Sequence, residues 1–256
     1  MFAVFSLVLV TGLAFQAGAP VRQTSTAASA VPSAGESTPS ALTPEMRGDI
    51  MMARKMYRDA LDYYKPGAEK SAVLANKTGI AYHQLQDLVN ARKYYEKAIK
   101  LNPKYAEAIN NLGTTFYARK SYRRAIEQYK KALRITPDSA SILSNLGTAY
   151  FARKNYMEAT NAYQQALALD PEVFERRSSQ GTLLQDQSVE ERAKFHYYLA
   201  KTYAHAGVKD RTMLYVRKAL EEGFKDRDKF MKEPEFAFLQ DDPEFKELLA
   251  TEQRVL

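Results

Sequence analysis

The sequence predicts an all-α solenoid of antiparallel helix pairs, on two observations: a 34-residue period, and helical spacing of the residues that recur. The stretch NNLGTTFYARKSYRRA begins at Asn110, and SNLGTAYFARKNYMEA begins at Ser144. A period of this length indicates repeated supersecondary units, each of which must stack on its neighbours to bury its apolar face. We number positions within a unit from 1, with Ala106 at position 1 of its unit.

The recurring residues lie on two helical faces, because positions 7, 8 and 11 share one helix side and positions 20, 24 and 27 share a second. Position 8 holds Gly79, Gly113 and Gly147, position 24 holds Tyr95, Tyr129 and Tyr163, and position 32 holds Pro103, Pro137 and Pro171. Proline ends the second helix of each unit. Glycine inside a helix costs about 1 kcal/mol relative to alanine, so its recurrence indicates a packing requirement. We expect the helices of a unit to cross at position 8 and the small alanine at position 20.

This pattern resembles the tetratricopeptide repeat (TPR) family, over residues 72–173. The resemblance implies a right-handed α-solenoid, the TPR superhelix, whose first helices line a concave groove through positions 2, 5, 9 and 12. It therefore implies a partner-binding surface made of the following residues: Asn76, His83, Asn110, Thr114, Tyr117, Ser144, Thr148 and Phe151. We also expect Tyr117 and Phe151 to lie outside the core.

The units on either side are less regular. Residues 41–71 align as a degenerate first repeat, with Thr43 as N-cap and Pro44 at the first helical position. The regular repeats at 72–105, 106–139 and 140–173 are followed by a polar loop insertion at 174–187. Ser188 and Glu191 form a capping box that starts a further TPR-like pair over 188–225. Residues 226–256 read as a C-terminal helical cap.

The N-terminus has the features of an export signal. Residues 1–19 hold an uncharged apolar run followed by a small-residue cleavage site, and we interpret them as a signal peptide. Residues 20–42 are rich in Ser, Thr, Ala and Pro, which indicates a disordered tether. We therefore expect a periplasmic or secreted protein with no integral span after cleavage. An uncleaved N-terminal anchor is the alternative.

Local motifs for catalysis are absent from the sequence. There is no Cys, the three His have no partner at metal-ligand spacing, and no nucleophile-elbow or phosphate-loop motif occurs. We therefore expect a protein that is not an enzyme and that needs no cofactor or metal.

The charge pattern bears on the partner. The formal charge is +7, and residues 72–139 hold 13 Lys/Arg against 5 Asp/Glu. Such a surface favours an acidic protein partner. We expect a non-enzymatic interaction scaffold or adaptor of the cell envelope that binds a peptide or helix of another protein in the groove. The alternative is a basic TPR protein that binds nucleic acid or another polyanion, because Arg119-Lys120 and Arg153-Lys154 lie in successive interhelix turns.

Overall fold

The computed structural model describes residues 42–175 and 188–250, and every regular element in these ranges is helical. The described residues belong to one compact unit of the chain. The predicted signal peptide, nearly all of the tether, most of the insertion and the last six residues lie outside the described residues. The prediction of an all-α solenoid of helix pairs is confirmed.

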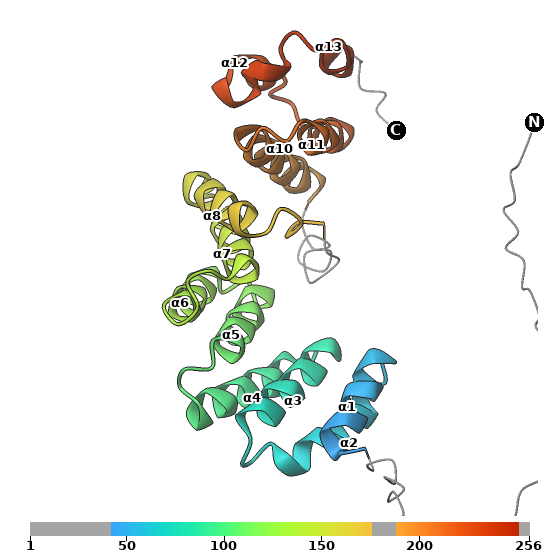
Figure 1. Cartoon of the computed structure of the whole chain (residues 1–256), viewed down its shortest axis with the longest axis vertical. Helices are drawn as coiled ribbons and strands as arrows, with labels where there is room; N and C mark the ends of the chain where they lie inside the picture. The colour runs from blue at the N-terminus through green and yellow to red at the C-terminus, as the bar shows by residue number, and fades with distance from the viewer. Residues whose placement is uncertain (1–41, 176–187, 251–256) are drawn as a thin grey trace, which may run out of the picture. The chain divides into compact units, whose positions relative to one another are not determined.

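In the described ranges five helix pairs follow one another in chain order (Figure 1), and within these pairs each helix packs on the next one along the chain. Although the insertion separates α8 (Tyr156–Leu169) from α10 (Val189–His205) in sequence, these two helices are in contact. The pairs are α1 (Pro44–Ala53) with α2 (Tyr57–Tyr64), α3 (Ala72–Gln84) with α4 (Leu88–Leu101), α5 (Ala106–Ala118) with α6 (Tyr122–Leu133), α7 (Ala140–Ala152) with α8 (Tyr156–Leu169), and α10 (Val189–His205) with α11 (Lys209–Glu221). The short elements are η1 (Lys65–Gly67), α12 (Lys229–Lys232), η2 (Pro234–Leu239) and α13 (Pro243–Ala250).

Side-chain caps define several helix starts. The Thr43 hydroxyl accepts a hydrogen bond from the Met46 amide at 3.2 Å, and Pro44 is the first helical residue of α1, as predicted. The predicted capping box of Ser188 and Glu191 is present at the start of α10. Such caps supply acceptors for amides that have no partner within the helix.

The turn inside each helix pair contains a residue in the left-handed conformation at position 15. In the α5–α6 turn, Lys120 has φ of 58°, its amide donates to the Tyr117 carbonyl at 2.8 Å, and the Ser121 amide donates to the Phe116 carbonyl at 2.9 Å. These two bonds form a Schellman motif, which usually has glycine at the left-handed residue. For a residue with a Cβ this conformation costs roughly 1–2 kcal/mol. The left-handed residues of the five pairs are Lys55, Gln86, Lys120, Lys154 and Gly207.

The glycine at position 8 makes room for the tyrosine at position 24, which differs from the expected crossing over the alanine at position 20. A Cβ placed on Gly113 would lie 2.6 Å from Cε1 of Tyr129, which is fully buried. At Gly147 the position-20 residue also comes close, through the Ala159 carbonyl oxygen at 3.2 Å. The corresponding Cβ–ring distances are 2.3 Å for Gly48 and Tyr64, 2.6 Å for Gly79 and Tyr95, and 2.5 Å for Gly147 and Tyr163.

The same contact supports the degenerate first repeat, because Gly48 and Tyr64 occupy positions 8 and 24 of that unit. The fifth pair has a different combination of residues at these two positions. Its positions 8 and 24 hold Ala200 and Val216, which are both fully buried in one apolar cluster. A larger residue at position 8 is thus matched by a smaller one at position 24.

The core includes Tyr117 and Phe151, so the expectation that they lie outside it is wrong. Their exposed fractions are 6% and 4%, and both belong to apolar clusters of buried residues. The Phe151 ring lies 5.4 Å from the rings of both Tyr156 and Phe195. Helix α10 packs against this side of α7–α8, and it covers a ring that would be exposed if the third regular repeat ended the solenoid.

Aromatic side chains close the C-terminal end. Phe224 stacks on Tyr197 of α10 at 4.4 Å between ring centroids, and Phe230, Phe236 and Phe245 are fully buried in the same cluster. The Asp242 carboxylate accepts from the Phe245 amide at 3.1 Å, which caps α13. The start of the insertion also contributes to the core: Phe174 is buried and lies 5.4 Å from the Tyr163 ring.

Candidate binding groove

A groove of about 930 Å³ runs along the inner helices α3, α5 and α7 and reaches the start of α10. Three consecutive units contribute the same positions to it. Position 12 is the last inward residue of the first helix, position 15 is the left-handed turn residue, and position 17 begins the second helix. These positions hold His83, Gln86 and Leu88, then Tyr117, Lys120 and Tyr122, then Phe151, Lys154 and Tyr156.

Of the eight predicted binding residues, five line this groove: His83, Asn110, Thr114, Tyr117 and Phe151. Asn76, Ser144 and Thr148 do not line it, and all three are buried. Their exposed fractions are 1%, 3% and 2%. The assumption that every position-5 and position-9 side chain faces the groove is therefore wrong at these three residues.

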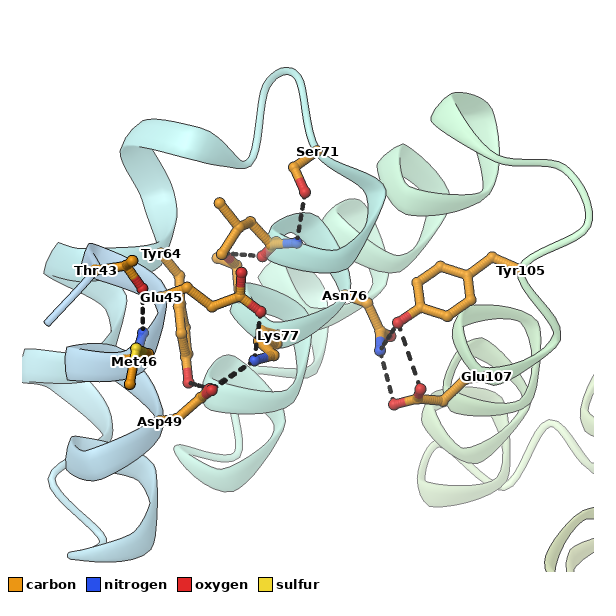
Figure 2. Close-up of polar contacts among 12 residues, drawn as sticks. Thr43, Glu45, Met46, Asp49, Tyr64, Ser71, Asn76, Lys77, Tyr105 and Glu107 are labelled. Atoms are coloured by element: carbon orange, nitrogen blue, oxygen red, sulfur yellow. Dashed lines mark hydrogen bonds and ion pairs between the residues drawn. The ribbon is translucent and has the colours of Figure 1, made fainter. Parts of the chain in front are cut away.

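Asn76 is buried because it joins two successive first helices. Its amide nitrogen donates to Glu107 Oε1 at 2.9 Å and to the Tyr105 hydroxyl at 3.4 Å, as Figure 2 shows. Its carbonyl oxygen accepts from the Asn111 amide at 3.0 Å. These partners occupy both ends of the side-chain amide, so Asn76 serves packing between units.

The contact repeats one unit later, where the Asn145 amide donates to Asn110 Oδ1 at 3.0 Å. Position 6 of one unit thus donates to position 5 of the preceding unit, and in both cases the residues are 35 apart in sequence. We call this series of contacts the inter-unit ladder. It holds the first helices in register along the floor of the groove.

A charged version of the ladder joins the first two units. Lys77 at position 6 donates to Glu45 at position 5 and to Asp49, each at 2.7 Å (Figure 2). Asp49 also accepts from the Tyr64 hydroxyl at 2.6 Å. Burial alone would raise the pKa of Asp49, but the hydrogen bonds from Lys77 and Tyr64 lower that pKa below its usual value.

Two threonines at position 9 accept hydrogen bonds from the tyrosines at position 24 of the same unit. The Tyr129 hydroxyl donates to Thr114 Oγ1 at 3.3 Å, and the Tyr163 hydroxyl donates to Thr148 Oγ1 at 3.4 Å. Burial raises the pKa of both tyrosines, so both remain neutral donors. Thr114 is half-buried and also borders the groove, whereas Thr148 is enclosed.

Some charged side chains of the groove have partners within the protein and others do not. Glu190 forms an ion pair with Lys194 at 2.8 Å, and Glu191 accepts from the Ser188 amide at 3.4 Å. Lys120 and Lys154 are exposed, and no described residue forms an ion pair or hydrogen bond with either ammonium. His83 lies deeper in the groove, where burial lowers the pKa of its imidazole.

The predicted peptide-binding residues did not include positions 15 and 17, which form one edge of the groove. Lys120 and Lys154 entered only the polyanion alternative. The signal was present in ARKSY and ARKNY, where a lysine and a tyrosine two residues apart recur with the period. Their contribution depends on the left-handed turn, which brings the lysine next to the end of the first helix. That conformation is unusual for lysine, so the sequence pattern alone does not indicate it.

Family comparison gives an independent result. The TPR repeat matches residues 79–119 and 113–153, and the tetratricopeptide repeat matches residues 140–173. These matches cover the three regular glycine–tyrosine units described above. Residues 79–173 of the chain therefore consist of tetratricopeptide repeats. A comparison with curated proteins finds no match.

Solved structures with similar folds include other TPR proteins. A crystal structure of MamA is 20% identical, with 68% of this chain and 93% of that chain covered and a TM-score of 0.48. MamA from Desulfovibrio magneticus RS-1 is 21% identical, with 70% and 92% covered and a TM-score of 0.49. The APC/C hetero-tetramer Cut9–Hcn1 is 17% identical, with 80% and 35% covered and a TM-score of 0.51. At these identities the likeness concerns the fold alone. None of the helices in the described ranges combines the length and apolar character needed to cross a bilayer.

Proposed function

We propose that this protein is a non-enzymatic interaction scaffold of the cell envelope, and that its groove holds an extended peptide or a helix of another protein. The observation that carries the proposal is the groove itself. It is lined by equivalent positions of three successive units, and the second and third of these units both place a lysine and a tyrosine along it. A repeating surface suits a repeating ligand such as a polypeptide chain.

The chemistry of the lining supports a polypeptide ligand. Asn110, half-buried, offers amide groups to a backbone, and the rings of Tyr122 and Tyr156 offer apolar contact at the edge. Tyr117 and Phe151 hold these edge rings in place, with centroid distances of 5.2 Å and 5.4 Å. Peptide-binding surfaces commonly combine hydrogen-bonding groups with rigid aromatic anchors.

The envelope location rests on the N-terminal sequence. Its apolar run and small-residue cleavage site support export. Mass spectrometry of the native protein tests this part of the proposal. We expect a mature chain that begins near residue 18 or 20, and a full-length chain in the cytosol would contradict it.

Site-specific photocrosslinking tests the groove. Ala118 lines the groove and is exposed, so a photoreactive residue there disturbs little packing. Met157 is 78% exposed and does not line the groove, and it provides the matched control. We expect crosslinks from position 118, mapped by mass spectrometry to one short segment of a partner, and none to that segment from position 157. Equal crosslinking of that segment from both positions would overturn the groove as the binding surface.

A polyanion is the second candidate, and the two unpaired lysines favour it. The rings of Tyr117 and Phe151 argue against base stacking, because both are buried. Binding of an acidic peptide and of oligothymidylate to the same chain distinguishes the two candidates.

A further inference from the structure

We propose that Lys120 and Lys154 determine the specificity of the groove, and that they select a partner segment with carboxylate side chains between apolar ones. This inference rests on the proposed function and adds the chemistry of the occupant. Both lysines adopt the left-handed conformation, with φ of 58° and 63°, at a turn position where the fifth pair has Gly207.

Lysine is a poor choice for this backbone conformation, and glycine is the usual residue at the end of a Schellman motif. The fifth pair has the glycine, and its turn lies outside the groove. Two turns at the groove have lysine, and not glycine, in this strained backbone conformation. Backbone strain that persists where a relaxed residue is available indicates that the side chain has a role.

Both ammonium groups are free to bind a ligand. The acidic residues of the groove already have partners: Glu107 accepts from Asn76 at 2.9 Å, and Glu190 is paired with Lys194. The pKa of Glu190 is lowered chiefly by its hydrogen bond to Lys194 and only last by the charge of Lys154. Lys120 and Lys154 therefore provide positive charge that the described residues do not neutralise.

The arrangement of these charges fits carboxylates on a peptide better than a phosphate backbone. The lysines lie one repeat apart, and a tyrosine at position 17 follows each of them in the lining. Glu107, Glu190 and Glu191 also border the groove and would repel a ligand with a negative charge at every residue. A peptide with spaced carboxylates can place its charges at the lysines and its apolar side chains at the rings.

An alternative role for the two lysines is to stabilise the end of the first helix of each pair. A control residue tests this alternative. A cation at the C-terminal end of a helix interacts favourably with the helix dipole. Lys55 has the same left-handed conformation, with φ of 61°, at the end of α1, but it does not line the groove. If lysine served only the helix end, Lys55 and the two groove lysines would respond alike in every assay.

The experiment measures fluorescence anisotropy with short labelled peptides on the full chain. One peptide alternates Glu with Phe, a second has Gln in place of Glu, and a third probe is single-stranded oligothymidylate of matched length. The variants are Lys120→Gly with Lys154→Gly, Lys120→Gln with Lys154→Gln, and Lys55→Gly as control. Thermal melting of each variant is measured in parallel.

We expect the acidic peptide to bind best. Loss of both groove lysines, to Gly or to Gln, should weaken its binding about tenfold, since each pair is a charge-assisted contact at a solvated edge. Lys55→Gly should leave binding unchanged. The glycine variants should all melt higher, by about 2 °C or more for each relaxed turn, whereas the glutamine variant should melt like the wild type.

Other results overturn the inference in distinguishable ways. Equal binding of the acidic and Gln peptides, unaffected by the lysine changes, leaves the scaffold intact and removes the charge selection. Tighter binding of oligothymidylate, lost in the same variants, assigns the lysines to a polyanion. If no peptide binds while crosslinking from position 118 succeeds, the groove holds a partner of different chemistry.

Discussion

Replacing Gly113 with alanine should destabilise the protein, although alanine is the better helix former. The added Cβ would lie 2.6 Å from Cε1, 2.8 Å from Cδ1 and 3.2 Å from Cζ of Tyr129. The ring cannot easily move away. It is fully buried, its hydroxyl is bonded to Thr114, and Ile126 and Ala132 are buried in the same cluster.

The magnitude is a balance of two effects. Alanine in place of glycine stabilises a helix interior by about 0.5–1 kcal/mol. Forcing an extra carbon into a packed core costs typically about 1–3 kcal/mol. The net loss for Gly113→Ala should be about 1–2 kcal/mol, which lowers the melting temperature by about 2–8 °C for a domain of this size.

A double-mutant cycle separates crowding from other causes. The fifth pair has Ala200 and Val216 at the same positions, so Tyr129→Val should remove the obstacle. In that background, Gly113→Ala should change sign and stabilise by about 0.5–1 kcal/mol. Circular dichroism melts of the four proteins provide the measurement. If Gly113→Ala raises the melting temperature with Tyr129 present, the glycine does not serve the ring and the packing argument fails.

Three further changes have outcomes that follow from the contacts. Asn111→Ala removes the donor to buried Asn76 and should cost about 1–3 kcal/mol in urea unfolding; adding Asn76→Ala should recover part of that loss. The pKa of His83 is lowered by burial, so its contribution to stability is complete above about pH 6.5 and falls as the pH drops below that value. His83→Gln should therefore flatten the stability profile between about pH 5 and 7, and an unchanged profile would contradict the assignment. Phe151→Ala should cost about 3–5 kcal/mol by leaving a cavity, and a wild-type melt would show that α10 does not cover the ring.

The sequence was sufficient for the features that depend on local patterns. The period, the helix pairs and the caps at Thr43 and Ser188 each follow from residues a few positions apart. The glycine at position 8 was correctly singled out as a packing residue. Its partner was not, because a helical spacing identifies a face but not the side chain that fills it.

The sequence could not predict which position-5 side chains border the groove. Asn76 and Ser144 share position 5 with Asn110, yet only Asn110 borders the groove. At Asn76 the next unit makes the difference, because its Glu107 and Asn111 both bond the Asn76 side-chain amide. These contacts join residues 31 and 35 apart, and the geometry between units decides them.

The inter-unit ladder has a consequence for how units can be recombined. Three junctions match position 5 of one unit with position 6 of the next, so a unit carries a compatible pair only if its own two residues match. Residues 106–139 carry Asn110 and Asn111, and a tandem duplication of this unit would reproduce the amide pairing at the new junction. Residues 72–105 carry Asn76 and Lys77, and their duplication would set an ammonium where the ladder has an amide. In evolution or in engineering, the chain should therefore lengthen through its second regular repeat.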